Sequence, residues 1–355
     1  MKCNLSDICD LITESVSYEH VRFNEYISTE NMIQDKGGIK PPSSVPVTGS
    51  VRKYQNGDVL VSNIRPYFKK IWYADKEGTC SNDILIFRAK KFCRSYFLYC
   101  ILSNDLFFQY MTSTSKGTKM PRGDQNAIMK YPLSLPDINT QYKVEKIIQS
   151  IDNLISHNSK INDYLFEVLR CEYLSLESEE CNFMRLSDIA LIEGGKRPEY
   201  VDVHISDRAT VPVIGASKII GYTEKFMFHD KVLVVGRVGT HGVVQRHFRR
   251  IWPSDNTLTI RTDYFEFVYQ VLKSIDYSIL NCGSTQPLIT QGDLKNVEIW
   301  VPKESKLLEY EHKVKPITNL IKNNLDENNI LGLIRDNLLP MLVSGESTHG
   351  FKSYS

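Results

Sequence analysis

The chain has 355 residues, of which 42% are hydrophobic, and eight cysteines that form no Cys-x-x-Cys pair. Its length favours two domains, and the cysteine spacing excludes the common zinc sites and suits buried thiols in a reducing compartment. No apolar run approaches the ~20 residues that span a bilayer, and the N-terminus lacks a signal-peptide core. We therefore expect a cytoplasmic protein without membrane contact.

The formal net charge of +1 hides a segregation of charge along the chain. Residues 50–130 hold 14 Lys and Arg against 6 Asp and Glu, and residues 196–261 hold 11 against 6. In contrast, residues 137–180 hold 4 against 9. Basic globular segments favour a polyanion as partner, and acidic helical segments favour a protein partner.

Residues 1–137 predict a mixed, strand-rich domain. Apolar runs at 59–61 and 84–87 are bounded by turn residues and predict buried strands. Residues 36–46 contain three prolines and predict a loop. Aromatic and aliphatic residues at helical spacing over 95–110 predict one short amphipathic helix.

Residues 138–180 predict a long helix, because apolar residues recur there every three or four positions without Pro or Gly. Such a heptad seam is how one helix pairs with another. The members of the seam are Ile147, Ile151, Leu154, Asn158, Ile161 and Leu165.

The second half of the chain repeats this order. Residues 181–302 predict a second mixed domain with strands at 232–235 and 257–260, residues 303–345 a second long helix, and 346–355 a tail. Pro316 predicts that the second helix begins or bends there. The second seam consists of Ile317, Leu320, Asn324, Leu331, Ile334 and Leu338.

Asn158 and Asn324 occupy the same place in the two seams, since 158 + 166 = 324. A lone Asn on a seam can fix the register of a coiled coil. Alternatively, each Asn faces water on an ordinary helix.

Short motifs confirm that the chain is a duplication. Leu5-Ser6-Asp7-Ile8 returns as Leu186-Ser187-Asp188-Ile189, and Gly117 returns as Gly283 (283 − 117 = 166). Two copies of this length indicate a pseudo-dimer in one chain rather than a solenoid. The loop tips differ between the copies, because Lys119-Met120-Pro121-Arg122 in the first copy corresponds to Thr285-Gln286-Pro287-Leu288 in the second. A shared scaffold with different loop residues favours two domains that recognise different sequences over two that recognise the same one.

The motifs of common enzymes are missing from the sequence. It contains no P-loop, no Asn/Asp-Pro-Pro-aromatic tetrapeptide, no His-Glu-x-x-His and no Gly-x-Ser-x-Gly elbow. The glycine-rich stretch 236–242 matches no phosphate-binding spacing and predicts a strand followed by a tight turn. We therefore expect a protein that is not catalytic by itself and binds no metal.

Basic, amide-bearing segments in both domains are candidates for DNA contact. Lys and Arg neutralise phosphates, and Arg, Asn and Gln can bond base edges. The alternative for each residue is an ordinary basic surface turn. The first domain offers Arg52, Lys53, Asn63, Arg65, Lys69, Lys70, Lys116, Lys119 and Arg122. The second offers Lys196, Arg197, Lys218, Arg237, Arg246, Arg249, Arg250 and Gln286.

Five groups of residues carry a resemblance to a known family. They are the two Leu-Ser-Asp-Ile motifs, Gly57-Asp58-Val59-Leu60 before Asn63-Ile64-Arg65, Gly236-Arg237-Val238-Gly239, Gly283-Ser284-Thr285-Gln286-Pro287-Leu288-Ile289, and Arg335-Asp336-Asn337-Leu338-Leu339-Pro340. In order and duplication the chain resembles the specificity subunit of a type I restriction–modification system, from residue 1 to about 346. Its one departure is a short second recognition unit.

The resemblance implies an α+β fold, in which two pseudo-symmetric target-recognition domains are joined by two long helices in an antiparallel coiled coil. Each domain would read one half of an asymmetric bipartite site in double-stranded DNA. The helices would space the domains and dock two methyltransferase subunits, and endonuclease/translocase subunits would join them. S-adenosylmethionine, ATP and Mg²⁺ would belong to those partners, so no cofactor is expected in this chain. The alternative is a coiled-coil scaffold that reads no DNA sequence.

Overall fold

The computed structural model describes residues 2–176, 181–203, 205–238, 242–280 and 288–344. The chain forms two compact units. Unit 1 comprises Met1–His157 and Glu327–Ser355, and unit 2 comprises Asn158–Asp326. Residues 1–137 and 181–302, the two predicted mixed domains, each fall within one unit, whereas the division cuts across the two long helices, because each long helix contributes one section to each unit.

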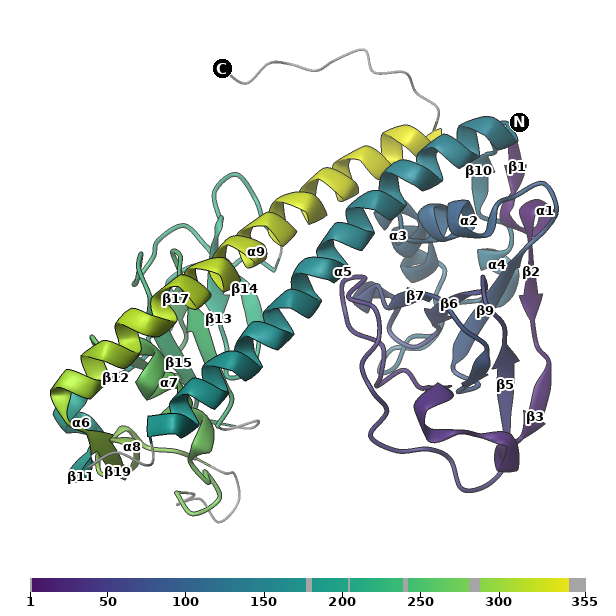
Figure 1. Ribbon diagram of the computed structural model, residues 1–355. Helices are drawn as coiled ribbons and strands as arrows, with labels where there is room; N and C mark the ends of the chain where they lie inside the picture. Colours follow the sequence, from purple (N-terminus) through teal and green to yellow (C-terminus); the bar gives the residue numbers. More distant parts are fainter. Residues whose placement is uncertain (1, 177–180, 204, 239–241, 281–287, 345–355) are drawn as a thin grey trace. The chain divides into compact units, whose positions relative to one another are not determined.

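Unit 1 contains a two-stranded ribbon and two four-stranded sheets (Figure 1). The ribbon pairs β1 (Lys2–Asn4) with β10 (Pro132–Ser134). The first sheet has the order β2 (Cys9–Ile12), β9 (Ile84–Ala89), β6 (Val59–Ser62) and β7 (Ile71–Tyr73). The second has the order β3 (Ser15–Ser17), β5 (Ser50–Tyr54), β8 (Gly78–Cys80) and β4 (Tyr26–Ile27).

Unit 2 repeats this plan with one strand fewer in its second sheet. Its ribbon pairs β11 (Cys181–Arg185) with β19 (Glu298–Pro302). Its first sheet has the order β12 (Leu191–Gly194), β18 (Thr257–Arg261), β15 (Val232–Gly236) and β16 (Val244–His247). Its second has the order β14 (Ile219–Thr223), β13 (Val211–Ile214) and β17 (Trp252–Pro253). The strands predicted at 59–61, 84–87, 232–235 and 257–260 are thus confirmed.

The two long helices are α5 (Ile138–Ser175) and α9 (Glu304–Ser344). The shorter helices of unit 1 are α1 (Leu5–Ile8), α2 (Ser95–Leu102), α3 (Asp105–Ser113) and α4 (Gln125–Ile128). Those of unit 2 are α6 (Leu186–Ile189), α7 (Phe265–Ser274) and α8 (Gln291–Lys295). Among the residues described, no helix is both long and apolar enough to cross a membrane.

One sequence-based expectation about the helices is wrong, and of the two outcomes expected at Pro316, a start or a bend, the start is wrong. The helix predicted over 95–110 is two helices, because Asn104 interrupts it and caps α3 by accepting the N–H of Leu106 at 3.0 Å. The second long helix does not begin at Pro316 but runs through it from Glu304. The buried neighbour Val314 anchors this stretch in the core, and such packing outweighs the roughly 3 kcal/mol that a helical proline costs.

The repeated Leu-Ser-Asp-Ile motif has a structural role that is the same in both units. The carboxylate of Asp7 accepts the N–H of Asn4 at 2.8 Å, and that of Asp188 accepts the N–H of Arg185 at 2.9 Å. The leucine of each motif is fully buried, and its N–H donates to the carbonyl of Tyr131 or Val297 at 2.9 Å. These acceptors are themselves 166 residues apart (297 − 131), so the motif joins the start of each unit to its end.

Each long helix helps to build the core of both units. In unit 1 the core includes Val144 and Ile148 of α5 and Leu339 of α9. In unit 2 it includes Leu169 and Tyr173 of α5 and Val314 and Ile321 of α9. The core of each unit is therefore completed by a helix from the opposite half of the chain.

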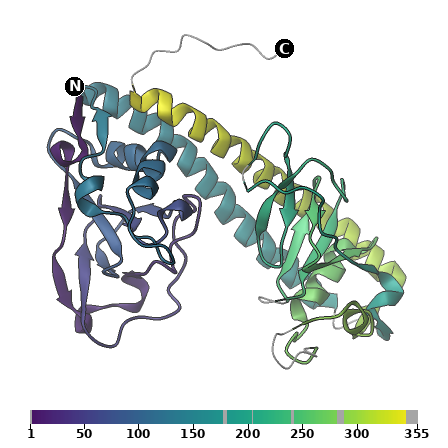
Figure 2. The ribbon, with the colours of Figure 1, turned by 180° about the vertical axis from the view of Figure 1, so that it is seen from behind.

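The helices run antiparallel within both units, as predicted, and lie side by side in Figure 1 and Figure 2. In unit 1 Arg335 pairs with Asp152 at 2.9 Å. In unit 2 the Nδ2 of Asn324 donates to the Oδ1 of Asn162 at 2.8 Å, and Lys313 pairs with Glu172. Later residues of α5 thus meet earlier residues of α9.

The predicted seam on α5 is only partly the seam that the structure uses. Ile151 is buried and Leu165 half-buried, but Ile147, Leu154 and Ile161 are 44–48% exposed. The neighbouring positions Ile148 and Asn162 are buried instead. The apolar residues of α5 follow two faces of one helix, and their spacing alone does not say which face meets α9.

The second seam shows the same division. Ile317, Leu331 and Leu338 are half-buried and Asn324 is buried, whereas Leu320 and Ile334 are 45% and 43% exposed. Asn324 does not face water, because it meets Asn162 of α5 across the helix pair. Asn162 lies one helical turn after the predicted seam position Asn158.

We predict that Asn162→Ala lowers the free energy of unfolding by about 1–3 kcal/mol, because it leaves the amide of Asn324 buried without that partner. Urea unfolding followed by circular dichroism measures the loss. Asn153→Ala, at an exposed position of the same helix, is the control. Replacing both Asn162 and Asn324 by Leu should recover stability, and a loss that is the same for Asn153→Ala as for Asn162→Ala would contradict the assignment.

Candidate nucleic-acid interface

Two loops of unit 1 bring predicted DNA-binding residues together. The turn after β6 contains Asn63 and Arg65, and the hairpin after α3 contains Lys116 and Arg122. The N–H of Arg65 donates to the carbonyl of Pro121 at 2.8 Å, and an isolated bridge joins Ile64 to Arg122. We call residues 63–70 and 116–123 the reading loops of unit 1.

The backbone of the reading loops is strained at defined positions. Arg65 has a φ of 52° and Lys69 a φ of 48°, both in the left-handed region. Asp35 and Lys36, in a neighbouring loop, have φ values of 54° and 62°. Each such residue costs on the order of 1 kcal/mol and persists only where its surroundings fix it, most often at functional sites. Among the residues described, these four are the only non-glycine residues with a positive φ.

The reading loops of unit 1 present cations and an aromatic ring to solvent. Arg65, Lys119 and Arg122 are exposed, and Arg122 is held by Asp83 at 2.9 Å. Lys116 is also exposed and pairs with Asp124. Tyr67 is 47% exposed at the tip of the turn, although we did not include it among the candidates. The position of Tyr67 in the sequence, between Arg65 and Lys69, was the signal that could have identified it as a candidate.

Three of the other four candidates of unit 1 have protein partners. Arg52 donates to the carbonyl of Ile84 at 2.9 Å, and Lys70 to that of Thr29 at 2.6 Å. Burial also lowers the pKa of Lys70. Lys69 pairs with Asp105 at 2.9 Å, while Lys53 on β5 is exposed. The contacts of Lys69 and Lys70 fix the first reading loop to neighbouring segments of unit 1. Lys53 lies on β5, which belongs to a different sheet from β6, the strand before Arg65.

Arg237 in unit 2 takes the structural place of Asn63 in unit 1. The carbonyl of Asn63 accepts the N–H of Gly123 at 3.3 Å, and that of Arg237 accepts the N–H of Ile289 at 3.0 Å. These donors are 166 residues apart (289 − 123), and the next residue of each turn forms an equivalent bridge, Ile64 with Arg122 and Val238 with Leu288. The Oδ1 of Asn63 and the Nε of Arg237 are both buried without a hydrogen-bond partner in the part of the chain described.

Lys196 and Lys218 border the same end of the unit 2 sheets as Arg237. The carbonyl of Lys218 accepts the N–H of Gly215 at 2.8 Å in a tight turn after β13, and the N–H of Lys196 donates to Pro253 at 3.0 Å. A Cβ added to Gly236, which precedes Arg237, would lie 2.2 Å from the carbonyl oxygen of Ala216 in that turn. Glycine is therefore required where this strand passes the turn. The side chains of Lys196, Arg197 and Lys218 are exposed.

A family model for the type I restriction modification DNA specificity domain matches residues 2–165 and again residues 178–330. The chain belongs to this family. It is a specificity subunit of a type I restriction–modification system with two specificity domains, so the resemblance seen in the sequence is confirmed.

Individual proteins agree with the family assignment. The specificity subunit of the type I restriction enzyme MjaIX from Methanocaldococcus jannaschii is 22% identical over 346 residues, which cover 84% of this chain and 79% of that subunit. The MjaVIII specificity subunit of the same organism is 21% identical over 296 residues, or 70% of each chain. The crystal structure of the S subunit of a type I system from M. genitalium has a TM-score of 0.58 at 14% identity, covering 97% of this chain and 96% of that one, and shows the shared fold.

Arg246 of the specificity subunit has a structural role in place of the predicted DNA contact. Its side chain is only 6% exposed and lies 3.1 Å from Glu266, which is 3% exposed. The two groups are misaligned for a hydrogen bond, so the contact is an ion pair. The guanidinium also stacks over the ring of Tyr269, 3.5 Å from its centroid. Sequence alone could not distinguish this inward-facing arginine from its exposed neighbours.

The last three candidates of the subunit differ in their surroundings. Arg249 is exposed and lies 3.6 Å from Asp326 of α9. Arg250 is exposed and stacks over Phe226 at 4.9 Å. Gln286 lies outside the described residues. These positions remain predictions.

Unit 2 of the subunit also buries a second carboxyl group near the Arg246 pair. Glu311 of α9 accepts the N–H of Phe267 at 2.9 Å, and burial raises the pKa of Glu311 from 4.5 to about 7. Burial likewise raises the pKa of Glu266, although Arg246 opposes the shift. The charge of Glu266 adds to the upward shift in the pKa of Glu311, so two carboxyl groups of unit 2 influence each other in a buried region.

We predict that Glu311→Gln flattens the pH dependence of stability. Because the folded pKa is raised, the contribution of Glu311 to stability is fully present below pH 4.5, where both states are protonated, and is lost progressively as pH rises from 4.5 through about 7. The amide cannot ionise and still accepts the N–H of Phe267. At pH 8 the variant should be more stable by on the order of 2 kcal/mol, measured by urea unfolding from pH 4.5 to 8.

The exposed Glu309→Gln variant is the control for this measurement and should retain the parent profile. A profile of Glu311→Gln that matches the parent at every pH would show that the Glu311 carboxyl does not titrate in this range.

Proposed function

We propose that each unit of the subunit reads one half of an asymmetric bipartite site in double-stranded DNA. The observation that carries the proposal is the substitution of Arg237 for Asn63 at one structural place of a duplicated frame. An amide can bond adenine bidentately and a guanidinium can bond guanine, so the two units favour unlike bases. The unpartnered Oδ1 of Asn63 and Nε of Arg237 support a role for both side chains in binding.

The surrounding cations support contact with the DNA backbone. Arg65, Lys119 and Arg122 in unit 1 and Lys196, Arg197 and Lys218 in unit 2 are exposed around these two positions. Phosphate contacts of this kind fix the position of a protein on the duplex, whereas base contacts supply the specificity.

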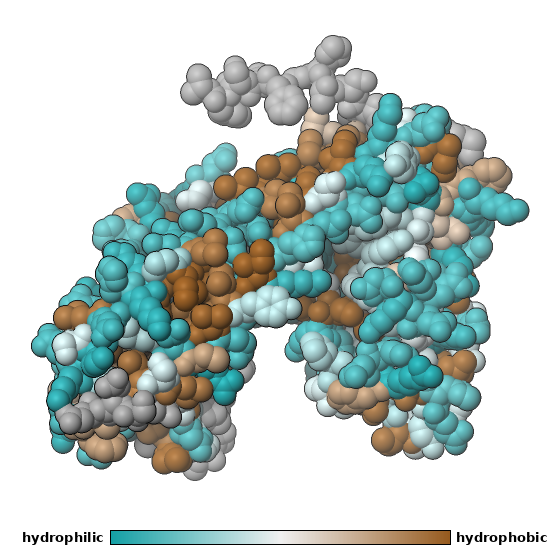
Figure 3. Space-filling model, in the orientation of Figure 1, coloured by the Kyte–Doolittle hydropathy of each residue, from teal (hydrophilic) through white to brown (hydrophobic). Residues whose placement is uncertain are grey.

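The proposal includes docking of two methyltransferase subunits on the long helices. Ile147, Leu154, Ile161 and Val168 of α5 recur every seven residues and are 43–48% exposed. Two of their counterparts on α9, Leu320 and Ile334, are also exposed, and Figure 3 shows hydrophobic side chains along the visible face of α9. A seven-residue apolar repeat on a helix suits a partner helix. Because part of the pattern returns on α9, two copies of one partner fit the two helices.

The chemistry in this proposal belongs to the partner subunits. Methyltransferase subunits would hold S-adenosylmethionine, and endonuclease/translocase subunits would hold ATP and Mg²⁺, while this chain selects the site. The family assignment favours this reading over the scaffold alternative, in which the helices would act without any DNA recognition.

We predict that Arg65→Ala and Arg237→Met each relax recognition of a different half-site. The loss at the affected half should be about 1–3 kcal/mol if the arginine bonds a guanine. A base-substitution scan of DNA binding by the subunit with its methyltransferase measures this, after methylome sequencing has supplied the target. Arg22→Ala, exposed in unit 1 away from the reading loops, is the control. A uniform loss over all sequences would mark phosphate contacts, and no discrimination by the parent at either half would refute the proposed function.

We predict that Leu154→Asp weakens association with the methyltransferase at least tenfold, since it places a charge within the apolar repeat. Titration calorimetry of the two purified proteins measures the affinity. Ser156→Asp, two residues along α5 and on another face of the helix, should leave the affinity unchanged. Equal affinities for the two variants would rule out this stripe as the docking surface.

A further inference from the structure

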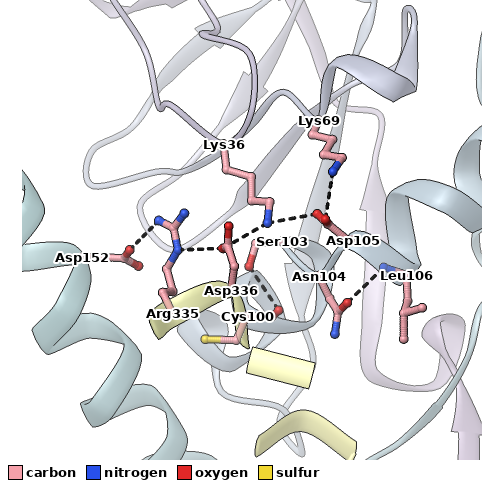
Figure 4. A network of polar contacts seen from close by, with 10 residues as sticks. All are labelled: Lys36, Lys69, Cys100, Ser103, Asn104, Asp105, Leu106, Asp152, Arg335 and Asp336. Carbon is pink, nitrogen blue, oxygen red and sulfur yellow. Dashed lines mark hydrogen bonds and ion pairs between the residues drawn. The ribbon is translucent and has the colours of Figure 1, made fainter. Parts of the chain in front are cut away.

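Six charged residues of unit 1 form a continuous series of ion pairs in which positive and negative side chains alternate (Figure 4). We call this series the Lys36 network. Lys69 lies 2.9 Å from Asp105, and Asp105 lies 3.0 Å from Lys36. Lys36 also lies 3.2 Å from Asp336, which is 3.2 Å from Arg335. The last member of the network is Asp152 of α5, which lies 2.9 Å from Arg335. The network thus runs from a reading loop to both long helices.

Lys36 is the central member of the network. Its side chain is only 6% exposed, whereas the carboxylates of Asp105 and Asp336 are about half exposed. A nearly buried ammonium group depends on its anionic partners, because it has little water to replace them. Burial alone would raise the pKa of Asp105, but Lys69 and Lys36 together lower it below its usual value. The Asp105 carboxylate is therefore held in the charged form.

The backbone of Lys36 is tied directly to a reading loop. The N–H of Asp35 donates to the carbonyl of Phe68, and that of Lys36 to the carbonyl of Lys69, both at 3.0 Å. Phe68 and Lys69 close the short turn η3 (Pro66–Phe68), which follows Arg65 and bears the exposed Tyr67. All four of the left-handed non-glycine residues thus lie in the two segments that the network joins.

The network is not part of the repeated frame. The position in α5 that corresponds to Asp336 is Arg170 (336 − 166 = 170), which has the opposite charge and pairs with Glu167 on its own helix. A contact that only held the duplicated scaffold together would be expected in both copies. This one is specific to the unit whose turn bears Arg65.

We propose that Asp336 of α9 is a positioning residue for DNA reading by unit 1, which it controls through Lys36 and the turn at residues 65–69. The inference rests on the proposed function, since it concerns how the reading loop is held. Asp336 itself contacts no DNA in this mechanism. Its carboxylate fixes the Lys36 ammonium, and Lys36 fixes the strained turn on which Arg65 and Tyr67 are presented.

The test compares Asp336→Asn with Asp326→Asn in the full-length subunit bound to its methyltransferase. Asp326 lies on the same helix, has a similarly exposed side chain and pairs with Arg249 in unit 2, so it is a matched control. Asp336→Glu retains the charge and serves as the rescue variant. Binding is measured on duplexes with single base substitutions in either half-site, and hydrogen exchange is measured over residues 31–40 and 63–70.

We expect Asp336→Asn to reduce discrimination about tenfold at one half-site only, the same half that Arg65→Ala affects, and to speed exchange in both segments several-fold. Asp336→Glu should restore most of the discrimination, and Asp326→Asn should leave this half-site unchanged. Unaltered discrimination by Asp336→Asn would overturn the inference, as would an equal loss at both half-sites with weaker methyltransferase binding. If the parent itself discriminates at neither half-site, the proposed function fails and the inference falls with it.

Discussion

The antiparallel pairing of α5 with α9 is the interaction on which the rest of the structure depends. Each helix follows one globular domain in the sequence, but each contributes buried residues to both units: Ile148 of α5 and Leu339 of α9 in unit 1, and Leu169 of α5 and Val314 of α9 in unit 2. Neither half of the chain therefore holds a complete core by itself. The repeated Leu-Ser-Asp-Ile motif joins the start of each domain to its end.

The duplicated parts of the two units are those that hold the fold, and the unlike parts include the residues that we propose contact DNA. The capping aspartates, the ribbons and the first sheet of each unit match between the units. Asn63 and Arg237 differ at one structural place, and Arg170, the counterpart of Asp336 in the Lys36 network, has the opposite charge and pairs with Glu167 on its own helix. A duplicated scaffold can thus carry different loop residues in its two copies.

Much of the fold could be predicted from the sequence because its signals are local. Apolar runs bounded by turns predicted the strands β6, β9, β15 and β18, and uninterrupted heptad spacing predicted the two long helices. The constant offset of 166 residues between repeated motifs indicated the duplication. The break at Asn104 was missed because a capping side chain in a helical pattern resembles any other polar residue.

The candidate site was harder to predict, because it depends on which way a side chain points. Arg246 and Arg249 are three residues apart, yet one is buried against Glu266 and the other is exposed. The apolar residues of α5 serve both the seam and the outer stripe, so Ile147 and Ile148 could not be assigned from their spacing. The turn that bears Tyr67 is held by a segment about 30 residues away, and Asp336 pairs with Lys36, which is 300 residues away. Contacts over such separations leave no local pattern in the sequence.

Hydrogen exchange on a chain that ends at Asp326 tests most directly whether α9 completes the core of unit 1. That truncation leaves all of unit 2 in place and removes only the second segment of unit 1. If α9 completes this core, residues 95–113 and 138–157 lose their protection while the sheet of unit 2 keeps it. Full protection of residues 95–113 in the truncated chain would show that the first domain folds without the second helix, and would contradict the central role of the helix pair.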